Sequence, residues 1–339
     1  MDEMKMMRRT TRLLIIAIAI WYSAPVQGAE DDTNNVLVLE AKVPLGDVRG
    51  RIDHLAADLG RKRLFVAELG NGSVGVVDLA AGKLLRRIGG LKEPQGVGYV
   101  PSVDALYAAS RGDGSVRVFS GDDYAAAGRI DLGDDADNVR VDLATNTVFV
   151  GYGAGALAAI DPKTGKKTDD IRLAAHPEGF QLSASTNRIF VNVPERRAIV
   201  AIDRASGQQQ ASWPTPNARD NFPMTLDEAN RRVIVVFRNP ARLDVFAMTS
   251  GEKIAEQNTC GDSDDVFMDA KRNRVYVSCG DGSIDVFAVE GTSYRRLGRL
   301  STVRGARTSL FIPAMDRLAV AVRANGREPA AIWVYRPRP

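Results

Sequence analysis

The chain has 339 residues, of which 45 are Lys or Arg and 42 are Asp or Glu, so its net charge is only +3. This weak charge argues against binding nucleic acid through a large basic surface, and we do not expect a nucleic-acid partner. The two cysteines form neither a C-x-x-C-H haem-attachment motif nor a paired C-x-x-C zinc motif, so no cofactor is predicted from them.

The first 28 residues have the pattern of a secretory signal peptide. A basic start is followed by an apolar run over residues 13–24 and then by small residues before a cleavage point at Ala29. The apolar run is too short to span a hydrocarbon core of ~30 Å; the alternative is an uncleaved N-terminal anchor. We therefore expect residues 1–28 to be removed and residues 29–339 to be one periplasmic or secreted domain with no membrane span.

A short strand-like run recurs at nearly constant spacing through the rest of the chain. Its seven copies begin at Arg63, Ala105, Thr147, Arg188, Arg232, Arg274 and Arg317. The runs are too short for helices, and their β-branched residues and flanking Gly and Asn favour strands. Seven repeats of about 42 residues predict an all-β fold, a seven-bladed β-propeller.

Each repeat predicts four strands, and thus a four-stranded antiparallel blade. In the first repeat these strands cover residues 54–58, 63–68, 74–79 and 84–89, with a Gly-Asn-Gly turn at 70–72. The last repeat ends with its third strand, residues 331–335. Residues 36–44 can supply the missing strand, which would close the ring and cover two sheet edges.

Three of these repeats also resemble a known motif. The segments are Leu64-Phe-Val-Ala-Glu-Leu-Gly-Asn-Gly-Ser-Val-Gly-Val-Val-Asp78, residues 148–165 and residues 189–203. They resemble the YVTN repeat, and the chain after residue 28 is similar to YncE-like YVTN-repeat propellers, which are WD40-like in architecture. The resemblance implies an exported bacterial propeller. Related propellers include lactonases, a lyase and non-catalytic partners of quinone and haem enzymes, so the fold does not select a function.

Polar residues gather in the loops that enter the inner strand of each blade and in the loops after each second strand. These loops open on one face of a propeller, around its channel. The candidate ligand-binding residues there are His54, Arg111, Asn138, His176, Glu178, Arg238, Asp265, Arg307 and Arg323. The arginines would contact an anionic group, and the others would give directional hydrogen bonds. The competing interpretation is that these residues form turn hydrogen bonds or pair with one another.

The favoured hypothesis is a monomeric binding protein whose channel face holds a small polar or anionic ligand, or a segment of a periplasmic protein partner. One alternative is a lactonase- or lyase-like enzyme, with His54 and Glu68 or His176 and Glu178 as its acid–base pair. No nucleophile motif supports it. Another alternative is an accessory scaffold for a periplasmic redox enzyme. No cofactor or metal is predicted, because compact metal-ligand spacings are lacking.

Cys260 precedes the inner strand of the sixth repeat and Cys279 ends its second strand. Both positions lie at the same end of the blade, and an exported protein meets oxidising conditions, so we expect a disulfide. It would close a loop of about 20 residues, worth roughly 3 kcal/mol. Free thiols or a redox pair are the alternatives.

Overall fold

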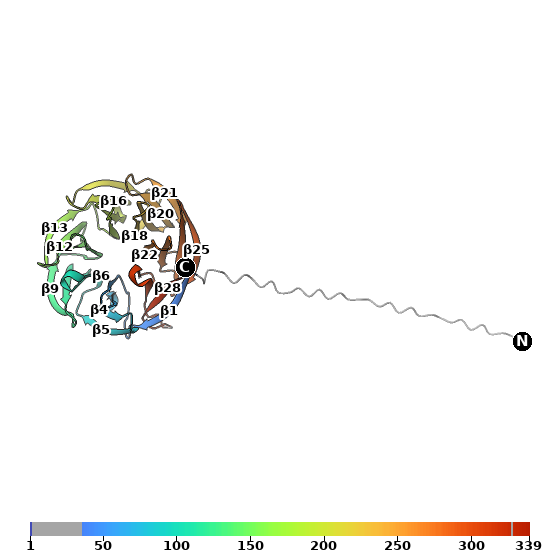
Figure 1. The fold of residues 1–339 in the computed structure, drawn as a ribbon, viewed down its shortest axis with the longest axis horizontal. Helices are drawn as coiled ribbons and strands as arrows, with labels where there is room; N and C mark the ends of the chain where they lie inside the picture. Colours follow the sequence, from blue (N-terminus) through green and yellow to red (C-terminus); the bar gives the residue numbers. More distant parts are fainter. Residues whose placement is uncertain (2–35, 327) are drawn as a thin grey trace. The chain divides into compact units, whose positions relative to one another are not determined.

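The computed structural model describes Met1, residues 36–326 and residues 328–339. Apart from Met1, the predicted signal peptide and its cleavage point lie outside the described residues. From residue 36 on, the described chain forms seven four-stranded sheets around one axis, which confirms the predicted seven-bladed propeller (Figure 1). Within the described residues, no helix is long and apolar enough to cross a membrane.

In each blade four strands follow one another from the axis outward, each antiparallel to the next. The inner strands are β2 (Leu55–Asp58), β6 (Pro94–Val100), β10 (Val139–Asp142), β14 (Phe180–Leu182), β18 (Arg219–Asp227), β22 (Ser263–Asp269) and β26 (Ser309–Ile312). The second strands are β3 (Arg63–Glu68), β7 (Ala105–Ser110), β11 (Thr147–Tyr152), β15 (Arg188–Val193), β19 (Arg232–Asn239), β23 (Arg274–Cys279) and β27 (Arg317–Val322).

The third and outer strands complete the blades. The third strands are β4 (Ser73–Asp78), β8 (Ser115–Ser120), β12 (Ala156–Asp161), β16 (Ala198–Asp203), β20 (Ala241–Ala247), β24 (Ser283–Glu290) and β28 (Ala331–Pro337). The outer strands are β5 (Lys83–Gly89), β9 (Ala125–Asp131), β13 (Lys166–Arg172), β17 (Gln209–Pro214), β21 (Lys253–Asn258), β25 (Ser293–Ser301) and, for blade 7, β1 (Leu37–Pro44). Short 3-10 turns lie at η2 (Leu69–Asn71), η3 (Pro101–Val103), η4 (Pro194–Arg196) and η5 (Pro313–Met315).

Blade 7 is built from both ends of the described chain, as the sequence predicts. Strand β1 pairs antiparallel with β28, from Leu37 opposite Pro337 to Pro44 opposite Ala331. Figure 1 shows these two strands side by side. An ion pair of 3.2 Å between Lys42 and Glu328 adds a side-chain contact across the closure.

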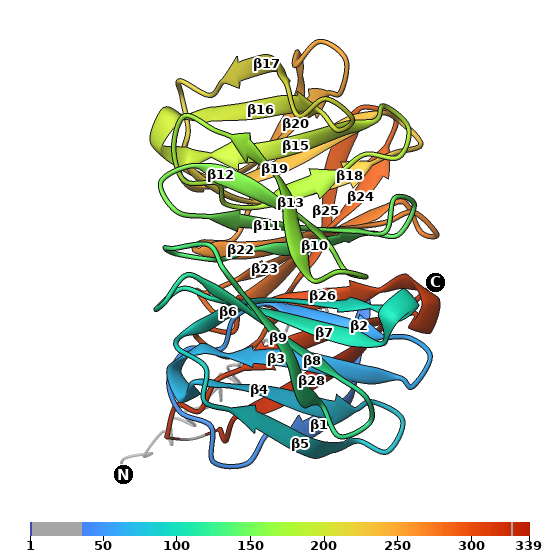
Figure 2. The same cartoon turned by 90° about the vertical axis from the view of Figure 1, so that its left-hand side faces the viewer.

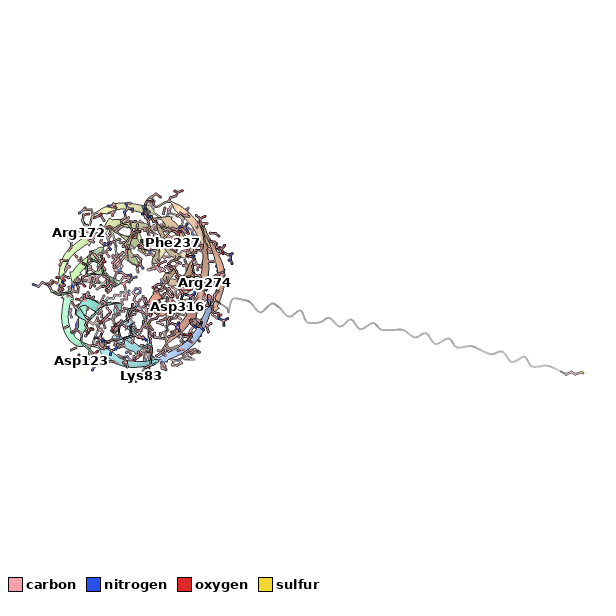
Figure 3. All side chains as sticks on the ribbon, viewed as in Figure 1. Lys83, Asp123, Arg172, Phe237, Arg274 and Asp316 are labelled. Carbon is pink, nitrogen blue, oxygen red and sulfur yellow. A yellow bond between two sulfur atoms is a disulfide. The ribbon has the colours of Figure 1, made fainter. Side chains whose placement is uncertain are left out.

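The core lies between the blades. Seven apolar clusters each combine residues of two neighbouring blades, which pack face to face in Figure 2. Between blades 1 and 2, for example, the Phe65 ring lies 5.6 Å from the rings of both Tyr99 and Tyr124. Charged residues such as Lys83 and Arg172 lie on the outer rim (Figure 3). Blades held by apolar faces leave the axis available for polar side chains.

Candidate functional site

A repeated irregularity at the start of the inner strands positions the candidate side chains. In blade 1, the amide of Asp53 donates to the carbonyl of Ala67 (2.7 Å), and the amide of Ala67 donates to the carbonyl of His54 (3.0 Å). Asp53 and His54 thus both lie opposite the single residue Ala67 of the second strand, as in a β-bulge. The bulge lets both Asp53 and His54 line the channel instead of alternating in direction, and the same exchange brings Asp137 and Asn138 together in blade 3.

These side chains surround a cavity of about 260 Å³ at the entry end of the inner strands, which we call the mouth cavity. Its polar and charged lining comprises Arg51, Asp53, His54, Gln95, Arg111, Asp135, Asp137, Asn138, Arg140, His176, Glu178, Gln181, Arg238, Asp264, Asp265 and Arg307. Eight of the nine candidate ligand-binding residues are therefore brought to one place. The ninth, Arg323, is exposed, is not part of this lining and lies close to Gly305.

Two glycines allow the inner strands to approach one another here. A Cβ atom on Gly96 would lie 1.9 Å from the carbonyl oxygen of Asp137 in the next blade, and one on Gly179 would lie 2.4 Å from that of Phe222. Real side chains do not tolerate such distances, so both positions require glycine. The close approach places side chains of neighbouring blades around the same space.

The arginines on the side of blades 5–7 are engaged by acidic partners. Arg307 contacts Asp262 through Nη1 (2.7 Å) and Asp264 through Nε (2.9 Å). Arg238 pairs with Asp264 and lies over the ring of Phe222, 4.1 Å from its centroid. Bidentate binding of an anion by these two arginines stays a prediction, and the ion pairs compete with it.

Asp137 lies between the two histidines. Its Oδ1 is 3.8 Å from Nε2 of His54, and its Oδ2 is 4.0 Å from Nε2 of His176. Among the described residues, no Lys or Arg nitrogen lies within 4.0 Å of this carboxylate. The Nδ1 atom of His176 is 2.6 Å from the carbonyl oxygen of Gly153, which fixes the ring orientation. Both histidines thus converge on one buried acid.

The two histidines differ in pKa because their surroundings differ. Burial lowers the pKa of His54. Burial also acts to lower the pKa of His176, but contact with Asp137, the Gly153 carbonyl and the charge of Glu178 raise it to about 9. Burial, followed by repulsion from Asp137, raises the pKa of Glu178 to about 8. The surroundings therefore favour the charged imidazole at His176 and disfavour it at His54.

Several buried polar atoms of the mouth cavity lack partners among the described residues. Five of them that have no hydrogen bond are Arg51 Nε, Asp53 Oδ1, Gln95 Oε1, Asp137 Oδ1 and Asn138 Oδ1. Of these groups, the Arg51 guanidinium and the Asp53 carboxylate form an ion pair with each other through Nη2 and Oδ2 (2.7 Å). Leaving such a group unsatisfied costs about 1–3 kcal/mol. Four of the five atoms are acceptors, and they come from blades 1–3. That wall can accept hydrogen bonds from a ligand.

Of the two acid–base pairs considered from the sequence, one is brought together in the cavity. Glu68 does not line the cavity, because its carboxylate is buried against Arg87, 2.7 Å away, so it is not available to His54. His176 and Glu178 both line the cavity. Their i,i+2 spacing was the sequence signal for a shared direction.

Sequence reasoning missed several lining residues, among them Asp135, Arg140 and Gln181. The last two could have been found. Each lies two residues beyond a position at the start of an inner strand, Asn138 and Gly179 respectively. Because side chains two apart on a strand share a face, the period of two could have found them. Arg140 donates to the carbonyl of Val139 (2.9 Å), and burial lowers its pKa.

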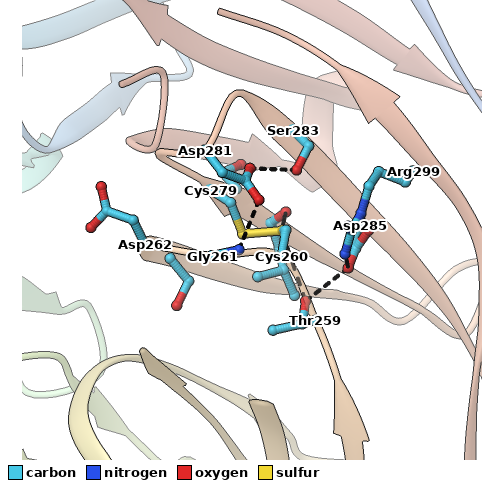
Figure 4. The surroundings of a disulfide bond; sticks show 12 residues. Thr259, Cys260, Gly261, Asp262, Cys279, Asp281, Ser283, Asp285 and Arg299 are labelled. Carbon is cyan, nitrogen blue, oxygen red and sulfur yellow. Dashed lines mark hydrogen bonds and ion pairs between the residues drawn. A yellow bond between two sulfur atoms is a disulfide. The ribbon is translucent and has the colours of Figure 1, made fainter. Parts of the chain in front are cut away.

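A disulfide joins Cys260 and Cys279 in blade 6 (Figure 4), the pair predicted from the sequence. The following loop is held further by a hydrogen bond from the Gly261 amide to Asp281 (2.9 Å). This loop continues to Asp262 and the other acids that bind Arg238 and Arg307. The cross-link therefore supports the wall of the cavity formed by blades 5–7.

Comparison with known proteins supports the fold. No protein-family model and no curated protein matches the sequence. A chain of hydrazine synthase from Kuenenia stuttgartiensis is similar in structure, with a TM-score of 0.72 and 16% identity, over 81% of this chain and 93% of that chain. A chain of the mitotic checkpoint complex has a TM-score of 0.75 and 10% identity, over 96% of this chain and 98% of that one. At such identities the likeness concerns the propeller fold alone.

Proposed function

We propose that this protein is an exported binding protein whose mouth cavity holds a small polar ligand. The observation that carries the proposal is the convergence on one cavity of five buried polar atoms that have no hydrogen bond. Folded proteins satisfy most of their buried polar groups, so a concentration of exceptions in one concave site points to a ligand that completes them.

The location and family of the protein form part of the same proposal. The order of charges, apolar residues and small residues before Ala29 supports export to the periplasm or the medium. The repeated motif supports membership of the YncE-like YVTN-repeat propellers. N-terminal sequencing of the protein from its native host tests the first point: the expected start is Ala29, and an intact Met1 would contradict cleavage.

The binding function is tested by thermal denaturation of the purified protein with a panel of sugars, organic acids, amino acids and amines. Asn138→Leu serves as the matched variant, because leucine has the same branched arrangement of side-chain non-hydrogen atoms as asparagine but presents no oxygen to the cavity. At least one compound is expected to raise the melting temperature of the parent protein and to lose its effect in Asn138→Leu. A panel with no effect on the parent protein would refute the proposal.

The opposite pKa shifts of His54 and His176 favour acid–base catalysis as a second candidate. One cavity would hold a neutral imidazole as base and a protonated imidazole as acid, on either side of Asp137. Turnover of a lactone that disappears in His176→Ala would support an enzyme. No turnover of a broad lactone panel would argue against this candidate.

A further inference from the structure

We infer that the mouth cavity binds a small uncharged polyol, a compound with hydroxyl groups on several carbons, against the wall formed by blades 1–3. This inference rests on the proposed binding function and names its ligand class. Its basis is the mixture of acceptors and donor in this wall, the way in which three inner strands adjoin one another, and the balance of charges in the lining.

The buried atoms without a hydrogen bond require a ligand that both donates and accepts. Asn138 is 2% exposed and Gln95 is 7% exposed, and both line the cavity with a side-chain oxygen that has no hydrogen bond. Oδ1 of Asp53 and of Asp137 are two further free acceptors, whereas Nε of Arg51 is a donor without an acceptor. An ammonium group only donates and a carboxylate only accepts, but a hydroxyl group does both. Hydroxyl groups can therefore satisfy every one of these atoms.

These atoms belong to one continuous wall, because the inner strands of blades 1–3 meet at their entry ends. The amide of His54 in blade 1 donates to the carbonyl of Gln95 in blade 2 (3.2 Å). The next residue, Gly96, lies so close to blade 3 that a Cβ atom on it would be 1.9 Å from the carbonyl oxygen of Asp137. The atoms nevertheless come from separate side chains. A ligand that reaches several of them needs donors on more than one of its atoms, which a polyol has and a single ammonium or amide group lacks.

The size of the cavity and the behaviour of water support the same class. A cavity of about 260 Å³ has room for on the order of ten non-hydrogen atoms. Each hydroxyl group carries the donor and the acceptor of the water molecule that it displaces. A polyol can therefore replace the hydration of this wall without loss of hydrogen bonds, whereas an apolar ligand of that size cannot.

The charges of the lining compensate one another, which disfavours an ionic ligand of either sign. The lining has six carboxyl groups, five guanidinium groups and the imidazole of His176, whose pKa of about 9 favours its charged form. When all of these groups are ionised, their charges cancel. Four of the guanidinium groups lie beside acids, and these pairs are Arg51 with Asp53, Arg111 with Asp135, and Arg238 and Arg307 with Asp264.

The remaining charged groups of the lining do not form a separate site for an ion. The charge of Arg140 is favoured by Asp265 and Asp137, although burial lowers its pKa. Protonation of Glu178, whose pKa is raised to about 8, leaves at most one excess positive charge. A charged ligand would thus give up its hydration with little gain from the balanced lining, whereas hydroxyl groups are cheaper to bury and find hydrogen-bond partners there.

D-Glucitol, 1-amino-1-deoxy-D-glucitol and D-gluconate provide the test, because they share one hydroxylated carbon chain and differ only at a terminal carbon. Each probe is titrated at pH 8 with the intact exported protein, and binding is followed by saturation-transfer NMR. Glucitol is expected to bind at least about fivefold more tightly than the amine or the carboxylate.

Two variants test whether the free acceptors hold the polyol. Asn138→Leu and Gln95→Leu each remove one side-chain oxygen from the wall, and each is expected to weaken glucitol binding by about fivefold. Asn258→Leu, at an exposed position on the outer strand β21, is the matched control and is expected to retain the affinity of the parent protein. The melting temperature of each variant shows that the protein compared is folded.

The outcomes separate this inference from the proposed function. Tighter binding of the amine or of gluconate than of glucitol would overturn the polyol inference, as would a glucitol affinity that is unchanged in both Asn138→Leu and Gln95→Leu. If glucitol and the sugars of the larger panel have no effect but an acid or an amine raises the melting temperature, the cavity is a binding site and the ligand class is wrong. If nothing in the panel has an effect, the proposed function itself fails.

Discussion

Strand β10 carries a buried acid near each end, and the two acids have very different surroundings. Asp142, at its far end, accepts hydrogen bonds from the Ala144 amide (3.0 Å) and the Thr145 hydroxyl (2.8 Å), and it pairs with Arg204 (3.0 Å). The carboxylate of Asp137, just before the strand, forms no pair with Lys or Arg among the described residues. Its Oδ1 atom has no hydrogen bond and lies 3.8 Å from Nε2 of His54. The two side chains are 5% and 4% exposed, so burial alone does not separate them.

The same contrast extends around the ring. Buried aspartates also end the inner strands of blades 1, 5 and 6, where each is bound by its own turn, as Asp58, Asp227 and Asp269 are. At the mouth, Asp53, Asp135 and Asp264 pair with arginines, and Asp265 accepts a hydrogen bond from the Ser309 amide (2.8 Å). Among the described residues, Asp137 and Glu178 have no such partner. The acids at the far end therefore stabilise the fold, whereas Asp137 and Glu178 at the mouth are available for a ligand.

The largest effect is expected at the far end. Asp142→Ala removes the acceptor of three hydrogen bonds and the carboxylate that pairs with Arg204, so the free energy of unfolding should fall by about 2–3 kcal/mol. Urea denaturation measures it, with Asp122→Ala as the exposed control, which should change by less than about 0.5 kcal/mol. A loss in Asp142→Ala no larger than in the control would remove the contrast between the two ends.

An intermediate effect is expected at Glu178, and it depends on pH. An acid whose pKa is raised on folding, here from 4.5 to about 8, stabilises the fold below pH 4.5, and this contribution is lost as the pH rises through 8. Glu178→Gln has no carboxyl group to ionise, so its free energy of unfolding does not fall in this way as the pH rises. The variant should therefore gain stability relative to the parent protein between pH 5 and pH 8, by on the order of 1 kcal/mol. Urea denaturation of both proteins at pH 5 and pH 8 measures this gain. If the difference in the free energy of unfolding between variant and parent does not change with pH, the raised pKa is contradicted.

The smallest effect on stability is expected at Asp137, the counterpart of Asp142 on the same strand. Asp137→Asn breaks no pair with arginine or lysine. It loses the contact that raises the pKa of His176, but it also removes the repulsion between Asp137 and Glu178. Because these two effects oppose each other, the free energy of unfolding should stay within about 0.5 kcal/mol of the parent value. Urea denaturation at pH 7 provides the measurement. A loss approaching that of Asp142→Ala would mean that Asp137 is a structural residue, like the acids at the far end.

The sequence predicts the fold more completely than the site for a physical reason. A strand run such as Arg63–Glu68 is set by local alternation and turn residues, and these recur in every repeat, so its bounds agree with β3. The inner strand expected over residues 54–58 starts at Leu55 instead, because the bulge takes up His54. Residue types alone do not reveal such a bulge. They therefore also do not reveal that two neighbouring side chains face the same space.

The partners of charged residues are the other part that sequence reasoning could not supply. Arg238 and Arg307 stand in different repeats, and both reach Asp264 in a third. Such pairs depend on how neighbouring blades are placed around the axis, which the spacing of repeats does not specify. Arg323 lies away from the mouth cavity for the same reason. The repeat places it in the loop after a second strand, but the repeat does not specify the direction in which its side chain extends.

The pairing of β1 with β28 also sets an order of events during synthesis. The first strand of the propeller leaves the ribosome long before its partner, because Leu37 pairs with Pro337 near the end of the chain. The apolar clusters between early blades can form while later blades are still being made, but the ring cannot lock until the final residues emerge. Until then the ring stays open, and one blade edge remains exposed for almost the whole of translation.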